Sequence, residues 1–320
     1  MRAAIVREVG ALPEPGELPD PTPSNGEALI EVRAAALNPI DLTIASGRFY
    51  AGPPQVPYAP GREGVGIVRE AATTAPGTRV RFERDTGYGA NGSLAELIVV
   101  EEEALVPLPD DADDRMAAAL GIAGLAAWLA LQKANIRDGE RVLVLGATGA
   151  VGQVAVQGAK LLGAGTVIGA GRDARALERT RELGADEVVV LAGGDEAAAF
   201  KNAAGGEIDA VIDPLWGEPA MAALDALRIG GRIVHLGTSA GAEAVVPSAP
   251  LRGKNVTIIG HSNLTTPHAV KARAYRELLD HVTAGRIHVD VDVFPFERVT
   301  DAWRAQAASP HRKLVVELPE

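Results

Sequence analysis

The segment Gly146–Gly152 has residue types and spacing that can bind the phosphates of a dinucleotide. It follows Arg141–Leu145, a short run of valine and leucine that is long enough for one buried strand. It leads into a helical apolar pattern over Val151–Leu162. In this setting Gly149 lets the backbone approach a pyrophosphate, and Gly152 lets the helix pack closely on the strand. The N-terminus of the helix would then attract the phosphates.

One position departs from the usual glycine fingerprint. Ala147 replaces the first glycine, so the motif reads A-x-G-x-x-G, and the alternative interpretation is a tight strand-to-helix turn that binds nothing. The spacing places Val154 and Ala155 on the buried face of the following helix. It places Gln153 and Lys160 on the opposite face.

The residues about twenty positions later indicate which cofactor binds. A second short strand, Thr166–Ala170, leads into Gly171, at the position where an NAD site carries a carboxylate. Arg172 follows, and a guanidinium can grip a 2′-phosphate with two hydrogen bonds. Asp173 suits the N-cap of a helix over Ala174–Leu183. The sequence therefore predicts NADP(H).

An alternation of strands and helices must position these residues, and it begins near residue 113. Such alternation predicts an α/β fold with a doubly wound parallel sheet. The expected strands are Arg141–Leu145, Thr166–Ala170, Val188–Leu191, Ala210–Asp213, Arg232–Leu236 and Val256–Ile259, and the expected helices are Asp113–Leu120, Gly124–Ala134, Val151–Leu162, Ala174–Leu183, Glu218–Leu227 and Pro267–Gly285.

The first third of the chain has no such rhythm and is rich in strands and turns. Its expected strands are Met1–Val9, Glu27–Arg33, Ile67–Glu70, Arg79–Phe82 and Gly92–Val100. Leu12–Pro23 is expected to be an irregular connection because of its prolines, and a short helix ends at Gly47. A last strand is expected at Lys313–Leu318.

Size and composition limit the function classes. A chain of 320 residues favours two domains. The net charge of −11 argues against nucleic acid and anionic membranes as standing partners. No apolar run is long enough for a membrane span, and no signal-peptide segment opens the sequence. Cysteine is absent, which excludes disulfides and thiolate chemistry; a cytoplasmic protein is expected.

Nine short motifs, in order over the full length, resemble the medium-chain dehydrogenase/reductase superfamily. The resemblance is strongest to its zinc-free quinone oxidoreductase branch, which is related to zeta-crystallin. The motifs are Asn38-Pro-Ile-Asp41, Ser46-Gly47, Pro60-Gly-Arg-Glu-Gly-Val-Gly66, Gly92-Ser-Leu-Ala-Glu96, Gly124-Leu-Ala-Ala-Trp128, Gly146–Gly152, Leu183-Gly-Ala-Asp186, Gly230-Gly231-Arg232 and Lys313-Leu-Val315.

The resemblance implies a Rossmann domain inserted into a GroES-like, mostly β catalytic domain. The expected boundaries are residues 1–118 and 262–320 for the discontinuous catalytic domain and 119–261 for the NADP-binding domain. Members are commonly dimers or tetramers joined through their Rossmann sheets, so a homodimer or homotetramer is expected.

The metal ligands of zinc-dependent relatives are missing. Arg62 stands where those relatives carry a histidine after Pro60-Gly61, and the region before Asn38 offers no cysteine. The six histidines lack the spacing of a helical metal site. No metal is expected, and a zinc-free site is better matched to quinones and α,β-unsaturated carbonyls, which delocalise the charge that hydride brings.

The candidate catalytic residues are Asn38, by its match to the family asparagine, and Tyr50 and Tyr58, on loops expected to overhang the substrate. Thr43 stands where relatives often carry a tyrosine, which puts the quinone preference in doubt. Ten candidate cofactor residues are expected at the ligand-binding edge of the sheet: Thr148, Gly149, Ala150, Val151, Gly171, Arg172, Pro214, Leu215, Leu236 and Gly237. Two more, His261 and Ser262, match the nicotinamide pocket of the family.

The sequence thus predicts an NADPH-dependent reductase of quinones or enones. One alternative is a zinc-free enoyl reductase that acts on acyl-thioesters in a biosynthetic pathway. The other is a non-catalytic NADPH-binding protein, since zeta-crystallin relatives have structural and RNA-binding roles, although the negative charge disfavours RNA.

Overall fold

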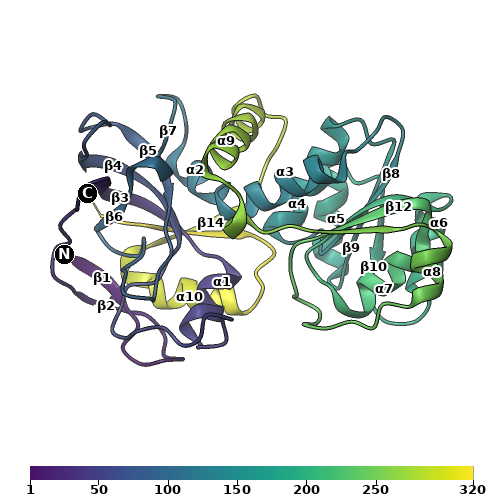
Figure 1. Cartoon of the computed structure of the whole chain (residues 1–320), viewed down its shortest axis with the longest axis horizontal. Coiled ribbons are helices and arrows are strands. Elements are labelled where there is room, and N and C mark those ends of the chain that lie inside the picture. The colour runs from purple at the N-terminus through teal and green to yellow at the C-terminus, as the bar shows by residue number, and fades with distance from the viewer. Residues whose placement is uncertain (320) are drawn as a thin grey trace. The chain divides into compact units, whose positions relative to one another are not determined.

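The computed structural model describes residues 1–319 and divides into two compact units (Figure 1). The first unit contains Met1–Ile122, His268–Tyr275 and the chain from Val289 onward. The second unit contains Ala123–Pro267 and Arg276–His288. The domain boundaries expected at residues 118 and 262 stay a prediction.

The first unit is built on a seven-stranded sheet in the order β14-β15-β3-β4-β5-β7, with β6 also paired to β3. Every pairing in it is antiparallel except that of β14 with β15. A separate hairpin joins β1 and β2. The strands are β1 (Arg2–Ile5), β2 (Glu14–Glu17), β3 (Glu27–Ala36), β4 (Glu63–Glu70), β5 (Arg79–Glu83), β6 (Leu97–Glu101), β7 (Val106–Pro107), β14 (Val291–Pro295) and β15 (Lys313–Glu317).

The alternation of the sequence explains the core of this unit. Ala28, Ile30 and Val32 of β3 are fully buried, and the residues between them are half-buried. A strand with this pattern buries one face and leaves the other toward solvent. The helical elements of the first unit are α1 (Pro39–Ala45), η1 (Glu102–Ala104), α2 (Asp114–Ala119), η3 (Phe296–Arg298) and α10 (Val299–Ala307).

The second unit is a six-stranded parallel sheet in the order β10-β9-β8-β11-β12-β13. Counted from β8, this is the 3-2-1-4-5-6 order of a Rossmann fold, and the strand order reverses between β8 and β11. The expected α/β fold with a Rossmann sheet is confirmed. The strands are β8 (Arg141–Leu145), β9 (Thr166–Gly171), β10 (Glu187–Val190), β11 (Ile208–Asp213), β12 (Leu227–His235) and β13 (Thr257–Gly260).

Helices cover the sheet of the second unit. Val142 to Leu145 of β8 are fully buried, as expected for a central strand of a parallel sheet. The helical elements are α3 (Ile122–Ala134), α4 (Ala150–Leu161), α5 (Ala174–Glu182), α6 (Glu196–Ala204), α7 (Gly217–Ala226), α8 (Ser248–Gly253) and η2 (Asn263–Thr265), and α9 (His268–Thr283) runs from the first unit into the second.

Several sequence expectations were wrong. The opening strand ends at Ile5, and Glu14–Glu17, inside the proline-rich connection, pairs with it as β2. Gln153 was expected on the polar face of α4 but is 2% exposed, and its amide donates to the carbonyl of Thr148 (3.2 Å). This hydrogen bond satisfies the buried amide and explains why it can face inward.

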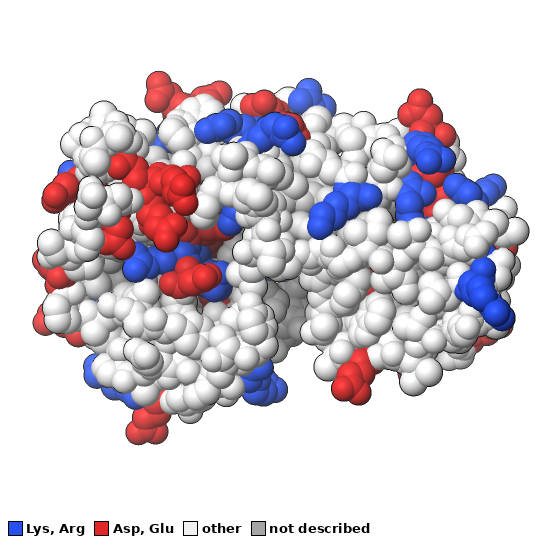
Figure 2. Space-filling view, in the orientation of Figure 1, with Lys and Arg blue, Asp and Glu red and all other residues white. Residues whose placement is uncertain are grey.

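Helices α6, α8 and α10 were not expected, because each has nine residues or fewer and so offers only a short stretch in which apolar periodicity can be recognised. None of the helices in residues 1–319 is long and apolar enough to cross a membrane. On the visible face of the molecule lysine and arginine are interspersed with acidic side chains, and a group of acidic side chains lies on the first unit, at the left (Figure 2).

Candidate active site

The glycine turn after β8 has the geometry of a phosphate cradle. Gly149 is the N-cap of α4, and a Cβ built on it would meet only the carbonyl oxygen of Gly146, at 3.7 Å. A Cβ on Gly152 would lie 2.4 Å from both that oxygen and the Cα of Ala147. The glycine at 152 therefore permits close packing inside the protein, whereas the glycine at 149 keeps open space at the N–H groups of α4.

The end of β9 lies beside this turn. Ala147 N–H donates to the carbonyl of Ala170 (2.9 Å), and a Cβ on Gly171 would lie 3.1 Å from a side-chain carbon of Thr148. The next residue, Arg172, is exposed, and its guanidinium makes no ion pair within residues 1–319. The end of β9 thus carries an exposed cation that pairs with no carboxylate of residues 1–319.

Asp173 does not compete for that ligand in the way a ribose-binding carboxylate would. Its side chain accepts a hydrogen bond from Ala176 N–H (2.9 Å) and caps α5. The predicted N-cap is confirmed.

The loops after β11 and β12 adjoin the glycine turn. A Cβ on Gly146 would lie 3.3 Å from Pro214 and 3.1 Å from Leu215. A Cβ on Gly237 would lie 2.6 Å from the carbonyl oxygen of Pro214, and Leu236 N–H donates to the carbonyl of Asp213 (2.9 Å). The structure therefore brings the predicted cofactor residues after β8, β9, β11 and β12 to one edge of the sheet.

Two residues that the sequence analysis did not select hold these loops. Asp213 is fully buried; its Oδ1 accepts from the N–H groups of Leu215 and Trp216 (both 2.9 Å), and its Oδ2 lies 3.0 Å from Nδ1 of His235. The His235 ring packs on Trp216 with centroids 4.4 Å apart. Asp213 and His235 thus join the ends of β11 and β12. In the sequence, Asp213 could have been recognised as a carboxylate that ends a predicted strand and precedes a proline.

The residues after β13 complete this edge. His261 N–H donates to the carbonyl of His235 (2.8 Å). The His261 ring is 8% exposed; its Nε2 lies 3.0 Å from the side-chain oxygen of Asn263, and its Nδ1 is buried without a partner. Burial, with the nearby cation of Lys133, lowers the pKa of His261 to about 4, so the ring is neutral near pH 7. Ser262 caps η2 by accepting from Leu264 N–H (3.2 Å).

Asn38, in the first unit, is buried among charged groups. Its amide donates to the Glu63 carboxylate (2.7 Å) and to the carbonyl of Ala36 (3.3 Å), and its oxygen accepts from Lys313 Nζ (2.6 Å). Lys313 also donates to Glu63 (2.9 Å). Protein groups therefore hold both ends of the Asn38 amide. A substrate contact by Asn38 stays a prediction.

The two candidate tyrosines differ in environment. Tyr50 is 82% exposed and packs on Phe49, with ring centroids 4.1 Å apart. Tyr58 is 3% exposed, and its hydroxyl is buried without a partner. Burial, and the carboxylate of Asp41, raise the pKa of Tyr58, so the phenol stays protonated and can donate. The structure does not pair the two tyrosines, and sequence reasoning had no means to distinguish them.

Asp41 is a second buried group next to Asn38. It lies in α1 and accepts a hydrogen bond from Asn38 N–H (2.8 Å) with one oxygen, while its other oxygen is buried without a partner. Burial raises the pKa of Asp41 to about 7, and the Asn38 N–H and the cation of Arg62 offset only part of that effect. Asp41 is therefore partly protonated at neutral pH.

This shift makes the stability of the first unit depend on pH. The pKa of Asp41 is higher in the folded chain than in the unfolded chain, so the native state binds this proton more tightly. The stability that this proton contributes is fully present below about pH 4 and is lost as the pH rises through 7. We expect Asp41→Asn to remove roughly 2–4 kcal/mol of the difference in unfolding free energy between pH 5 and pH 8. Urea denaturation at both pH values measures this difference in unfolding free energy, and Asp111→Asn, at an exposed position, is the control. If Asp41→Asn keeps the pH dependence of the native chain, the raised pKa of Asp41 is contradicted.

Comparison with known proteins places this geometry in a family. Residues 24–110 match the alcohol dehydrogenase GroES-like domain, and residues 150–283 match the zinc-binding dehydrogenase family. A quinone oxidoreductase of Rattus norvegicus is 31% identical over 268 residues, which cover 82% of this chain and 80% of that protein. The chain belongs to the medium-chain dehydrogenase/reductase superfamily.

Two further similarities come from a solved structure and from a much longer protein. The crystal structure of the quinone oxidoreductase from Thermus thermophilus, also determined as a complex with NADPH, has a TM-score of 0.83 and 31% identity, covering 99% of this chain and 100% of that one. A phenolphthiocerol/phthiocerol polyketide synthase subunit of Mycobacterium tuberculosis is 31% identical over 309 residues. These residues are 93% of this chain but 14% of the length of that subunit.

Membership of this superfamily identifies the chain as an oxidoreductase of a nucleotide-binding dehydrogenase family. The predicted superfamily, fold and enzyme class are therefore confirmed. The edge formed by the ends of β8, β9, β11, β12 and β13 is where such a fold binds a dinucleotide. The open space at Gly149 fits a pyrophosphate there.

A catalytic zinc, by contrast, does not fit the side chains present. Cysteine is absent from the sequence, and Arg62 is a cation whose guanidinium pairs with Asp85. Within residues 1–319, three side chains lie close enough together to hold a metal ion: Glu101, Glu103 and His268. Both glutamates are exposed, and none of the three is a candidate site residue.

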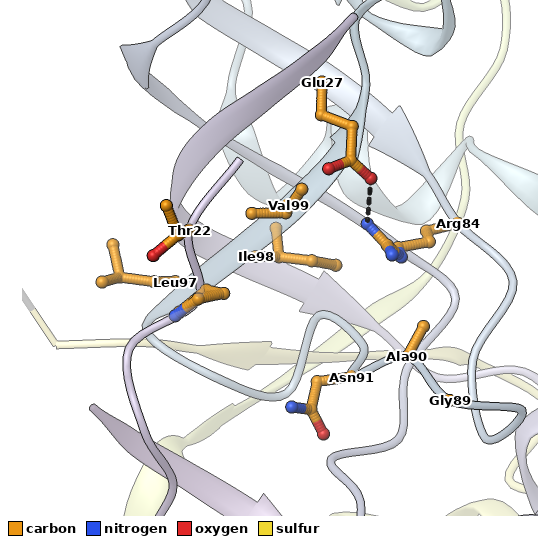
Figure 3. Close-up of a pocket in the computed structure, with 10 residues that line it drawn as sticks. Thr22, Glu27, Arg84, Gly89, Ala90, Asn91, Leu97, Ile98 and Val99 are labelled. Atoms are coloured by element: carbon orange, nitrogen blue, oxygen red, sulfur yellow. Dashed lines mark ion pairs between the residues drawn. The ribbon is translucent and has the colours of Figure 1, made fainter. Parts of the chain in front are cut away.

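A surface pocket in the first unit is separate from the candidate catalytic residues. Its volume is about 190 Å³. Figure 3 shows the side chains that line it. Glu27 and Arg84 form an ion pair of 3.9 Å across it, and neither Asn38 nor the two candidate tyrosines line it.

Proposed function

We propose that the protein is a zinc-independent, NADPH-dependent reductase of quinones or α,β-unsaturated carbonyls. The choice of NADPH over NADH rests on two residues at the end of β9. Arg172 is exposed there without an ion pair, and the neighbouring Asp173 is engaged as the cap of α5. A free guanidinium at this point favours a 2′-phosphate over a 2′-hydroxyl.

Different residues of the second unit would bind different parts of the cofactor. Thr148 to Val151 and the N-terminus of α4 would bind the pyrophosphate, and Gly171 with Arg172 the adenosine end. Leu215, Gly237 and the neutral His261 would line the nicotinamide end. When bound, the dihydronicotinamide supplies the hydride. Asp213 would hold the two loops that contact it.

The substrate class follows from the donor set. Without a metal ion, an ordinary ketone lacks the Lewis acid that stabilises a developing alkoxide, a contribution of several kcal/mol. Quinones and enones spread that charge over a conjugated system, so hydrogen-bond donors such as the protonated Tyr58 suffice.

The expected result of a cofactor titration is tight NADPH binding, weak NADH binding, and loss of that difference in Arg172→Ala. The reason is that one charge-assisted, bidentate contact to the 2′-phosphate contributes about 1.5–3 kcal/mol, or roughly 10- to 100-fold in Kd. Nucleotide fluorescence follows the titration. Arg252→Ala, on exposed α8 of the same unit, is the control and is expected to keep the preference.

Reduction is then tested with a panel of quinones and enones. Absence of NADPH oxidation with every member of the panel would refute the substrate class. Equal affinity for both nucleotides in the native chain would refute the cofactor assignment.

A second candidate is a zinc-free enoyl reductase that acts on acyl-thioesters, and the similarity to the polyketide synthase subunit favours it. A reductase of enones and one of α,β-unsaturated thioesters both reduce a carbon–carbon double bond conjugated to a carbonyl. A ratio of kcat/KM for an α,β-unsaturated thioester over a free enone separates them. If NADPH binds but neither substrate class is reduced, the remaining candidate is a non-catalytic NADPH-binding protein.

A further inference from the structure

Among the buried polar atoms of the first unit that lack a hydrogen-bond partner within residues 1–319 are Oδ1 of Asp41, the hydroxyl of Tyr58 and Nε of Arg62. The three residues are 1%, 3% and 7% exposed. Leaving one such group unpaired costs about 1–3 kcal/mol, so buried groups of this kind are nearly always satisfied. Three of them in one region need an explanation.

The surrounding contacts place Asp41 and Tyr58 in one region. Asp41 and Ile44 are three residues apart in α1 and share a face of the helix. A Cβ on Gly87 would lie 3.1 Å from Ile44 and 3.4 Å from the Tyr58 ring. The buried face of α1 and the Tyr58 ring therefore meet at Gly87.

Arg62 reaches the same region from the next segment. Its guanidinium pairs with Asp85, two residues before Gly87, and the Asp85 side chain is 80% exposed. The cation of Arg62 is close enough to lower the pKa of Asp41, and it also influences Lys271 and Tyr88. The carboxylate of Asp41 in turn raises the pKa of Tyr58. The three groups are electrostatic neighbours.

We propose that Tyr58 and Arg62 bind the carbonyl oxygen of the substrate, with the phenol hydroxyl and Nε–H of the guanidinium as donors. This assignment rests on the proposed function and names the residues that act on the reacting oxygen. Asp41 is a positioning residue beside them. Its protonated form leaves the positive charge of Arg62 uncancelled by a second carboxylate.

The chemistry balances with these groups. With an enone, hydride from the dihydronicotinamide forms a C–H bond at the β-carbon, the carbon–carbon π bond breaks, and its electrons move toward the carbonyl oxygen. The dihydronicotinamide is thereby oxidised to the nicotinamide. The oxygen becomes that of an enolate, held by the phenol and the guanidinium, and the α-carbon then takes a proton from water, which leaves hydroxide. A guanidinium thus provides the electrostatic stabilisation of the oxyanion in a site without a metal.

A binding experiment tests the site without any cofactor. The probe is p-nitrophenol, whose phenolate absorbs visible light and carries charge on an oxygen as the reduced substrate would. With excess protein, we expect the phenolate band to appear at lower pH than in buffer, because the site binds the anion more tightly than the phenol. In Arg62→Gln the shift should vanish, and Arg62→Lys should restore part of it.

Two further variants keep the test decisive. Arg84→Gln is the matched control, because Arg84 faces Glu27 at the separate pocket of Figure 3, and it should retain the shift. Asp85→Asn removes the exposed carboxylate that competes for Arg62, so it should tighten phenolate binding even if Arg62→Gln fails to fold. No shift in the native chain, or an equal shift in Arg62→Gln, overturns the proposal.

Kinetics separate this proposal from the proposed function. With an enone substrate, we expect Arg62→Gln to lower kcat by roughly 100- to 1,000-fold, the usual loss for one oxyanion donor, with a smaller change in KM. Tyr58→Phe should lower kcat as well. If NADPH and enones react but kcat is unchanged in both variants, the oxygen site is wrong and the reductase assignment stands. If NADPH does not bind while the phenolate shift depends on Arg62, the reductase assignment fails and the oxygen site stands.

Discussion

Replacing Lys313 by methionine is expected to lower the free energy of unfolding by about 3–5 kcal/mol. Lys313 opens β15 and is 3% exposed. Its ammonium donates to the carboxylate of Glu63 (2.9 Å), which is 1% exposed, and to the oxygen of Asn38 (2.6 Å). In the variant the buried carboxylate keeps only Arg81, at 3.9 Å, as an opposite charge, and it keeps the hydrogen bonds from Asn38 and the backbone.

Urea denaturation of the full chain measures this loss. Lys201→Met is the control, because Lys201 lies half-exposed on α6 and should cost less than about 0.5 kcal/mol. The double variant Lys313→Met with Glu63→Gln removes both charges and should recover part of the stability, since the unpaired charge is the main cause of the loss. Equal costs for Lys313→Met and Lys201→Met would show that the buried charges are not coupled.

The second unit was largely predictable because its signals are local. Arg141–Leu145 is a strand with the expected bounds, and α4 begins one residue before the expected start. Alternation of apolar runs with amphipathic helices is enough to predict a parallel sheet, and a glycine turn between a strand and a helix marks its ligand-binding edge. The N-cap role of Asp173 was predictable for the same reason.

The charged network of the first unit could not be predicted, because its members are far apart in the sequence. Lys313 and Glu63 are separated by 250 positions, and Lys313 and Asn38 by 275. Only the pairing of β15 with β3 brings the last strand beside the first part of the chain. From the sequence Asn38 was a candidate for substrate contact, and nothing local indicated that Glu63 and Lys313 would hold both ends of its amide.

Gln153 shows a related limit. A helical wheel assigns a face from residue type, and a glutamine therefore falls on the polar side. The hydrogen bond from its amide to the Thr148 carbonyl, within the glycine turn itself, lets the glutamine point inward. Such a satisfied polar group beside a ligand-binding turn depends on atomic positions that periodicity does not contain.

The glycine turn supplies the second large effect, through two variants that separate binding from folding. Gly149→Ala is expected to keep the stability within about 1 kcal/mol, because its Cβ meets only one oxygen at 3.7 Å and its φ of −80° suits alanine. The new methyl group occupies the space at the N-terminus of α4, so we expect the Kd for NADPH to rise about tenfold or more.

Gly152→Ala should behave differently, because its Cβ would lie 2.4 Å from the backbone of Gly146 and Ala147. Backbone atoms cannot move aside as the end of a side chain can, so the helix must shift away from the strand, with an expected loss of about 1–3 kcal/mol or more. Thermal unfolding and NADPH titration of both variants check this contrast. If Gly149→Ala binds NADPH as the native chain does, the open space at that glycine is not where the pyrophosphate binds. If Gly152→Ala is as stable as the native chain, close helix–strand packing is not the reason for glycine at that position.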